Sequence, residues 1–165
     1  MITVFIILPI GLFATFSRIG NGLPGLIVTL IIATIISLEI GGLMEKKNYR
    51  YFLWLNTMLI TLSIVSYYLF GLAVFDAGYM FVIQMALLIL NMLVMMAVES
   101  VTGQFDRAIE NISVSFFSYI SLGVFLPFII LIKMMDPSGF MLGMLLGLTW
   151  FTDAGGLFIG KIFGK

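Results

Sequence analysis

The residues best suited to chemistry lie together at the C-terminal end of the chain. The last seventeen residues read TWFTDAGGLFIGKIFGK and combine one carboxylate, Asp153, with two lysines, Lys161 and Lys165. A carboxylate is a ligand for hard cations such as Mg²⁺, and a lysine is a compact charge that can hold a phosphate. Neighbouring glycines let a ligand or another backbone approach closely. This combination suits an anionic substrate bridged by a metal ion.

These residues are expected on one apolar helix. Gly156, Gly160 and Gly164 follow Asp153 and are four residues apart from one another. At about 100° per residue, they lie within roughly 60° of the direction of Asp153, and Lys161 lies about 80° away. A charge at the centre of a membrane span costs about 2.5–3.5 kcal/mol, so a carboxylate there needs a cation, water or a protein partner. Two interpretations stay open. Asp153 pairs with Lys161 or marks the end of the membrane, or it binds a cation in a cavity open to the cytoplasm.

The two lysines also allow two interpretations. Basic residues commonly end a span on the cytoplasmic side, where their side chains reach the surface and attract anionic lipid. Alternatively, Lys161 and Lys165 hold substrate phosphates beside the glycine-rich backbone.

The composition defines the class of protein that must position these residues. The chain has 165 residues, of which 62% are apolar and 10% charged, with a mean hydropathy of +1.21. Too few polar side chains are present to cover a soluble core, so the sequence predicts an all-α, polytopic transmembrane bundle. The net charge of zero gives no indication of nucleic-acid binding. The lack of cysteine and histidine excludes disulfides, thiolate metal sites and histidine bases, and favours oxygen ligands for any metal.

The apolar runs predict about six membrane spans in one integral membrane domain covering residues 1–165. A span needs about 20 apolar residues, because a helix rises about 1.5 Å per residue across about 30 Å of hydrocarbon. The first run has no basic residue before it and is therefore expected to be a span rather than a signal peptide. The predicted spans are residues 1–17, 23–44, 51–75, 77–98, 112–132 and 139–163.

Polar residues between the spans predict how the spans connect. The break at Asp76 is very short and predicts a tight hairpin of the third and fourth spans. Ser138 is a candidate N-cap for the last helix. Pro127 predicts a kink in the fifth span, and Arg107 with Glu110 predicts a short interfacial helix.

The polar residues inside the spans have simple structural interpretations. Interhelical hydrogen bonding is the expected role of Asn56, Gln84 and Asn91. Glu39, near the end of the second span, is either an interfacial residue or part of the wall of a lipid head-group cavity.

The distribution of basic residues predicts the orientation. With a cytoplasmic N-terminus, six basic residues face the cytoplasm and only Arg18 and Lys133 face the other side. The positive-inside rule then places both termini, and the Asp153 segment, at the cytoplasmic face. We expect this membrane to be a bacterial inner membrane.

The C-terminal segment resembles a motif of the phosphatidate cytidylyltransferases, the CDP-diacylglycerol synthases. The upstream stretches LEIGGLMEKK, with Glu39, and RAIENISVSFFSYISLGVFLPFIILIK, with Tyr119, are similar to other parts of that family. The chain departs from the motif at Ala154, where a hydroxyl is usual, and Thr152 could replace it. The matching residues of the motif are Trp150, Asp153, Gly155, Gly160, Lys161, Phe163, Gly164 and Lys165.

The resemblance implies an activity. Enzymes of this family join CTP to phosphatidate and release diphosphate, making CDP-diacylglycerol for phospholipid biosynthesis with Mg²⁺. It implies that Asp153 is a catalytic, metal-binding residue and that Lys161 and Lys165 hold phosphates, with Glu39 and Thr152 near the head group. The implied partners are CTP, phosphatidate and membrane lipid, with no nucleic acid.

The resemblance also implies that part of the family's machinery is not in these residues. The family's later Lys-Thr-x-Glu-Gly segment and its Asp-rich signature are absent from positions 1–165. We therefore expect a truncated form, inactive by itself, that would act with a complementing C-terminal fragment or as a homodimer. The other interpretations are a transporter or channel fragment that uses Asp153, a non-catalytic membrane scaffold, or a CTP-dependent polyprenol kinase.

Overall fold

The computed structural model describes residues 22–102, 107–136 and 138–163 of the chain. Every regular element in these ranges is helical, which confirms the all-α prediction. The elements are α2 (Leu23–Lys46), α3 (Leu53–Gly71), α4 (Ala77–Thr102), α5 (Ala108–Tyr119), the π-helical segment η2 (Ile120–Phe125), α6 (Phe128–Met135) and α7 (Phe140–Phe163).

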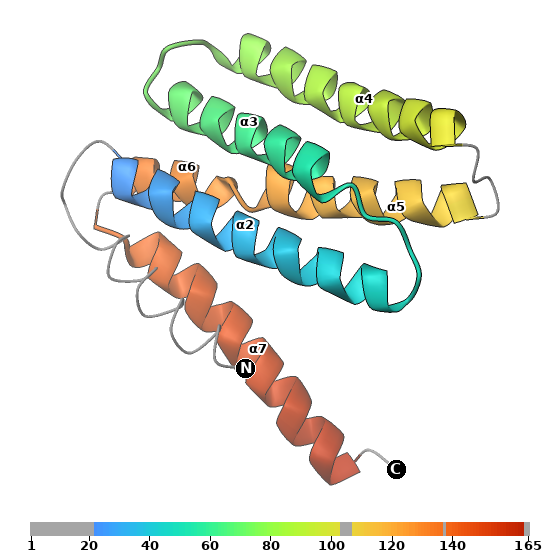
Figure 1. Cartoon of the computed structure of the whole chain (residues 1–165). Coiled ribbons are helices and arrows are strands. Elements are labelled where there is room, and N and C mark those ends of the chain that lie inside the picture. Colours follow the sequence, from blue (N-terminus) through green and yellow to red (C-terminus); the bar gives the residue numbers. More distant parts are fainter. Residues whose placement is uncertain (1–21, 103–106, 137, 164–165) are drawn as a thin grey trace.

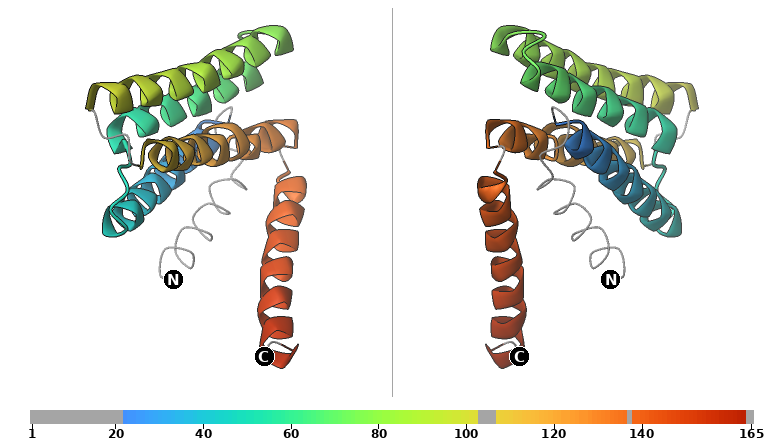
Figure 2. Two further views of the ribbon diagram at one scale, coloured as in Figure 1. Left: turned by 90° about the vertical axis from the view of Figure 1, so that its right-hand side faces the viewer. Right: turned by 90° about the vertical axis from the view of Figure 1, so that its left-hand side faces the viewer.

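α2, α3, α4 and the in-line segment α5–η2–α6 run in alternating directions and form a bundle around α3 (Figure 1). α3 packs against α2 and α4, and also against the α5–η2–α6 segment. The short turn at Asp76 joins α3 to α4, so the predicted hairpin is confirmed. α7 contacts α6 and then extends away from the other described helices, as both views of Figure 2 show.

The predicted spans correspond to observed helices with shifted ends. α2, α3, α4 and the segment Ala108–Met135 are each long and apolar enough to cross a membrane. The chain is therefore an integral membrane protein by the length and composition of its helices. The predicted span 1–17 lies outside the described residues. α7 is 24 residues long. The total of six spans and the orientation of the termini remain predictions.

Two sequence-based expectations need correction. Arg107 and Glu110 do not form a separate interfacial helix, because Ala108 begins α5, which continues to Tyr119. The third span is shorter than predicted, since α3 ends at Gly71 instead of Phe75. The chain turns there through Ala73, which has a φ of 57°.

The interior of the bundle is rich in small and polar residues, and many large apolar side chains face outward. α2 buries residues at spacing four, namely Gly25, Thr29, Ala33 and Ser37. Ala33 of this stripe lies in one core cluster with Leu59 and Ile60 of α3. Small residues suit such contacts, because packing rather than the hydrophobic effect drives helix association in lipid. The outward-facing apolar residues, among them Trp54 and Phe81, are suited to a lipid environment.

Amide and hydroxyl side chains join α3, α4 and α5 inside the bundle. The fully buried Asn56 amide donates to the Tyr51 hydroxyl at 2.9 Å and to the Ser115 carbonyl at 3.2 Å. The Asn91 amide of α4 donates to the Asn56 carbonyl oxygen at 2.8 Å. Tyr51 and Ser118 share a further hydrogen bond of 2.8 Å. The expected interhelical role of Asn56 and Asn91 is confirmed.

A second polar cluster forms where Pro127 interrupts the fifth span. Proline has no N–H, so the carbonyl of Gly123 lacks its usual helical donor. The Ser63 hydroxyl of α3 is hydrogen-bonded to this carbonyl and also lies 2.8 Å from the Gln84 carbonyl oxygen. The Gln84 amide donates in turn to the Ser66 hydroxyl at 2.7 Å. The span is interrupted at Pro127, between the π-helical turns of η2 and the start of α6, and the predicted kink stays a prediction.

Side chains also cap the helices at their N-termini. The Asp76 carboxylate accepts the Tyr79 N–H at 3.0 Å at the start of α4. At the start of α7, Ser138 accepts the Phe140 N–H at 3.2 Å, and the Asp136 carboxylate accepts the Met141 N–H at 2.8 Å. Gly139, not Ser138, occupies the N-cap position, since α7 begins at Phe140. The predicted side-chain contact of Ser138 with the first turn is present, and Asp136 is a second capping residue.

Replacing Asn56 by alanine should destabilise the bundle. The variant leaves the Asn91 amide and the Ser115 carbonyl without their partner, so we expect a loss of about 1–2 kcal/mol in the free energy of unfolding. Unfolding in mixed micelles with increasing SDS, followed by circular dichroism, measures this loss. Thr34→Ala is the control, because Thr34 is exposed and bonds only within its own helix. Equal stability of the two variants would contradict the prediction.

The cap of α7 should depend on pH at acidic values. The Met141 N–H, followed by the Ser138 hydroxyl, holds the pKa of the Asp136 carboxyl below its ordinary value of 3.8. Since the folded pKa is the lower one, the cap is fully present above pH 3.8 and is lost as the pH falls through the folded pKa.

The NMR shift of the Met141 amide measures this titration. We expect a midpoint below 3.8, the ordinary pKa of an aspartate, and no such transition in Asp136→Asn. Ser138→Ala should raise the midpoint. A wild-type midpoint at or above the ordinary value would refute the capping role.

Candidate functional site

The structure places the predicted catalytic segment on α7. Asp153 lies within this helix, and its side chain is outside the described part of the structure. Lys161 is exposed in the last turn, and Lys165 lies outside the described residues. Thr152 is exposed, and its hydroxyl donates to the Leu148 carbonyl at 2.8 Å. The Thr152 hydroxyl is thus hydrogen-bonded to the backbone of its own helix.

Glu39 is exposed on α2. In Figures 1 and 2, α2 and α7 diverge toward their C-terminal ends. A shared site containing Glu39 and Asp153 therefore remains a prediction. Helix α7 itself buries Leu142 near its start, whereas Met144 and Leu148 are exposed apolar residues.

The described residues do not form a ready-made metal centre. No group of three or more Asp, Glu, His or Cys side chains lies together within them. Asp153 is the one acidic residue in the sequence of α7. Mg²⁺ is often held by one or two carboxylates together with substrate phosphates, so the oxygen donors of this chain suit it chemically, without a preformed cluster.

A polar cluster that the sequence did not predict lies at the opposite end of α4 from the Asp76 hairpin. Glu99 is only 2% exposed, and its Oε1 accepts the Asn111 amide at 2.9 Å. Asn111 is also buried, and its carbonyl oxygen accepts the Arg50 N–H at 2.9 Å. Glu99 and Asn111 therefore link α4, α5 and the loop before α3. The other oxygen of Glu99 has no hydrogen-bond partner among the described residues.

A signal for Glu99 was available in the sequence. Gln84, Asn91 and Glu99 follow one another at spacings of seven and eight, which places them on one face of α4. The predicted fourth span ended at residue 98 and so left Glu99 out of the helix. In the structure α4 extends to Thr102 and includes Glu99.

The same end of the bundle carries most of the described basic side chains. Lys46, Lys47, Arg50 and Arg107 all lie there. The Arg107 guanidinium lies 5.3 Å from the centre of the Tyr49 ring and donates to the Lys47 carbonyl at 3.3 Å. This contact joins the start of α5 to the loop after α2.

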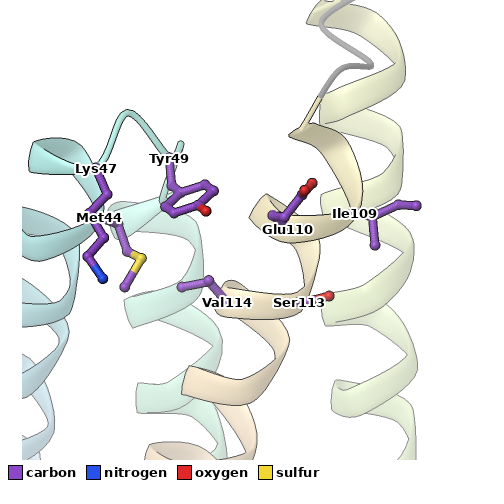
Figure 3. A pocket seen from close by; sticks show the side chains of 7 residues that line it. All are labelled: Met44, Lys47, Tyr49, Ile109, Glu110, Ser113 and Val114. Atoms are coloured by element: carbon purple, nitrogen blue, oxygen red, sulfur yellow. The ribbon is translucent and has the colours of Figure 1, made fainter.

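A cavity of about 520 Å³ lies beside these basic residues, between the end of α2 and the start of α5. Figure 3 shows Met44 and Lys47 on one side, Glu110 and Ser113 on the other, and Tyr49 between them. Its volume is within the range of about 300–1,000 Å³ that is usual for small-molecule sites. The lining residues are Met44, Lys47, Tyr49, Ile109, Glu110, Ser113 and Val114.

Substitutions at Glu99 should separate the effect of its charge from that of its hydrogen bond. Glu99→Gln keeps an acceptor for the Asn111 amide and removes a buried carboxylate, so we expect stability equal to or above wild type. Glu99→Ala should cost about 1–3 kcal/mol, because it leaves the buried Asn111 amide unpaired. Unfolding in mixed micelles compares the two. A larger loss for Glu99→Gln than for Glu99→Ala would show that the charge itself is needed.

Comparison with known proteins agrees with the resemblance of the C-terminal motif. A family model described as the cytidylyltransferase family matches residues 1–165. No curated protein and no solved structure was found to match. Because the match covers the whole chain, from the first apolar segment to the Asp153 motif, the chain belongs to the cytidylyltransferase family.

Proposed function

We propose that this chain acts in the transfer of a cytidylyl group from CTP to phosphatidate, which releases diphosphate and forms CDP-diacylglycerol. Membership of the cytidylyltransferase family supports a CTP-using transferase. Four apolar helices of spanning length place that transferase in a membrane, where a lipid acceptor is available. The observation that carries the proposal is the family match over residues 1–165, with Asp153 and Lys161 in its C-terminal motif.

The proposed reaction explains why a carboxylate and lysines occur in an apolar helix. The phosphate oxygen of phosphatidate attacks the α-phosphorus of CTP, and both reactants are anions. Catalysis then requires alignment of the two phosphates and screening of their repulsion. Lys161 and Lys165 would supply positive charge, and the acyl chains would stay among the helices. The head group would meet CTP at the membrane surface, which we propose is the cytoplasmic face of a bacterial inner membrane.

Mg²⁺ is part of this proposal as the cation that Asp153 would help to hold. A bound magnesium ion would reduce the negative charge of the nucleotide phosphates. The described residues offer no cluster that would hold the ion without substrate. The nucleotide phosphates would therefore have to supply further ligands.

The buried polar residues do not support the transporter alternative. The amide and hydroxyl groups of Asn56, Asn91, Ser63 and Gln84 hydrogen-bond to other protein groups. They thereby hold the helices together. The scaffold alternative gives no role to Asp153. Phosphatidate rather than a polyprenol is the proposed acceptor on the strength of the Asp153 motif and its resemblance to phosphatidate cytidylyltransferases.

Asp153→Asn should weaken Mg²⁺-dependent binding of CTP. Equilibrium binding of radiolabelled CTP to the purified chain, in micelles containing phosphatidate, measures the effect. We expect a loss of about tenfold or more in affinity, because removing one charge-assisted ligand costs about 1.5–3 kcal/mol. Glu45→Gln, an exposed carboxylate at the end of α2, should bind as wild type does. Binding that depends on neither Mg²⁺ nor Asp153 would argue against the proposal.

Turnover should need more than these residues. Positions 1–165 lack the further carboxylates that the resemblance implies. We therefore expect no CDP-diacylglycerol from labelled CTP, phosphatidate and Mg²⁺ with this chain alone. Activity should appear when a C-terminal fragment carrying the family's Asp-rich signature is added. Product formation by residues 1–165 alone would refute this expectation.

A further inference from the structure

We propose that the cavity between α2 and α5 binds the phosphoethanolamine head group of a membrane phospholipid. This site is separate from the Asp153 segment, and the inference does not depend on the proposed enzymatic activity. It rests on the position of the cavity, on the presence of both polar and apolar residues in its lining, and on the signs of the charges that line it.

The cavity lies where a lipid head group would be. It is formed by the last turn of α2 and the first turns of α5, both helices of the membrane-spanning set. Arg50 and Arg107 lie at the same end of the bundle. Basic hollows between the ends of membrane helices commonly take the phosphates of lipid head groups.

The lining combines polar and apolar side chains. Met44, Ile109 and Val114 are the apolar residues of the lining. The polar residues are Lys47, Tyr49, Glu110 and Ser113. A free phosphate has no group that would use the apolar residues, whereas the first carbons of an acyl chain would cover them.

The charges of the lining identify the kind of head group. Lys47 is on the α2 side and Glu110 on the α5 side of the cavity (Figure 3). Both side chains are exposed, and no ion pair joins these two described residues. A ligand that bridges them must therefore present an anion to Lys47 and a cation to Glu110. Phosphoethanolamine carries both, and its ammonium has N–H donors for the carboxylate.

Other common head groups satisfy only part of this lining. Phosphatidylglycerol offers the phosphate without a cation for Glu110. The cation of phosphatidylcholine has no N–H donors for Glu110. Such a cation can pack on an aromatic ring, but the Arg107 guanidinium already lies 5.3 Å from the centre of the Tyr49 ring. Electrostatic complementarity of this kind determines specificity more than total affinity.

Lipid selectivity of the purified full chain tests the proposal. The chain in detergent is titrated with phosphatidylethanolamine, phosphatidylglycerol or phosphatidylcholine of identical acyl chains, without CTP, and bound lipid is counted by native mass spectrometry. We expect phosphatidylethanolamine to bind about tenfold more tightly than either of the others, the effect of one charge-assisted hydrogen bond. Equal binding of all three lipids would overturn the proposal without any variant being needed.

Two variants and two matched controls locate the binding. Glu110→Gln should remove the preference for phosphatidylethanolamine over phosphatidylglycerol. Lys47→Gln should weaken binding of both lipids about tenfold. Glu45→Gln and Lys46→Gln remove neighbouring exposed charges that do not line the cavity, and should change neither value.

Two further results would overturn the assignment. One is a preference for phosphatidylglycerol that Glu110→Gln leaves unchanged, which would indicate a general basic surface for anionic lipid. The other is an equal loss of binding in the control variants. Circular dichroism of each variant establishes that its helix content is retained. Because CTP is absent from the titration, a negative result here says nothing against the cytidylyltransferase proposal.

Discussion

Hydrogen bonds between buried side chains of different helices are the interaction on which this bundle depends. Lipid offers no hydrophobic force that favours one helix pairing over another, so packing and polar contacts must select the arrangement. Asn56 of α3 provides such contacts to both α4 and α5. Ser63, two turns further along, reaches the carbonyl that Pro127 leaves without a helical donor. The irregular fifth span and the regular α3 therefore stabilise each other.

This arrangement has a consequence for function. The inner part of the bundle uses its polar groups to hold the helices in position. Ionisable groups, in contrast, collect near the helix ends, with Glu99, Arg50, Arg107 and Glu110 at one end of α4 and α5. The chemistry of a membrane transferase takes place at the surface, where a soluble nucleotide can meet a lipid. A bundle held together from within leaves the helix ends available for such contacts.

Several features could be predicted because they depend on local sequence. The helical class follows from long apolar runs, and the turn at Asp76 from the shortness of the break there. Ser138 was recognisable as a cap from its place before an apolar helix. The Asp153 motif pointed to the family that the whole chain matches. Helix ends were less predictable, since α4 continues to Thr102 through residues that look like a polar connection.

The amino-acid sequence by itself determined that the chain is a helical membrane protein, which segments are apolar, and which family it belongs to. These properties depend on the local sequence and do not require knowing which residues are in contact in the folded chain. Only the tertiary structure decided that Glu99 is buried against Asn111, that Ser63 meets the Gly123 carbonyl, and that Lys47 and Glu110 line one cavity. Each of these pairs joins residues from different helices or, for Lys47, the residue that follows α2 and a residue of α5. Their contacts depend on how those helices pack, which the spacing of residues within one helix does not specify.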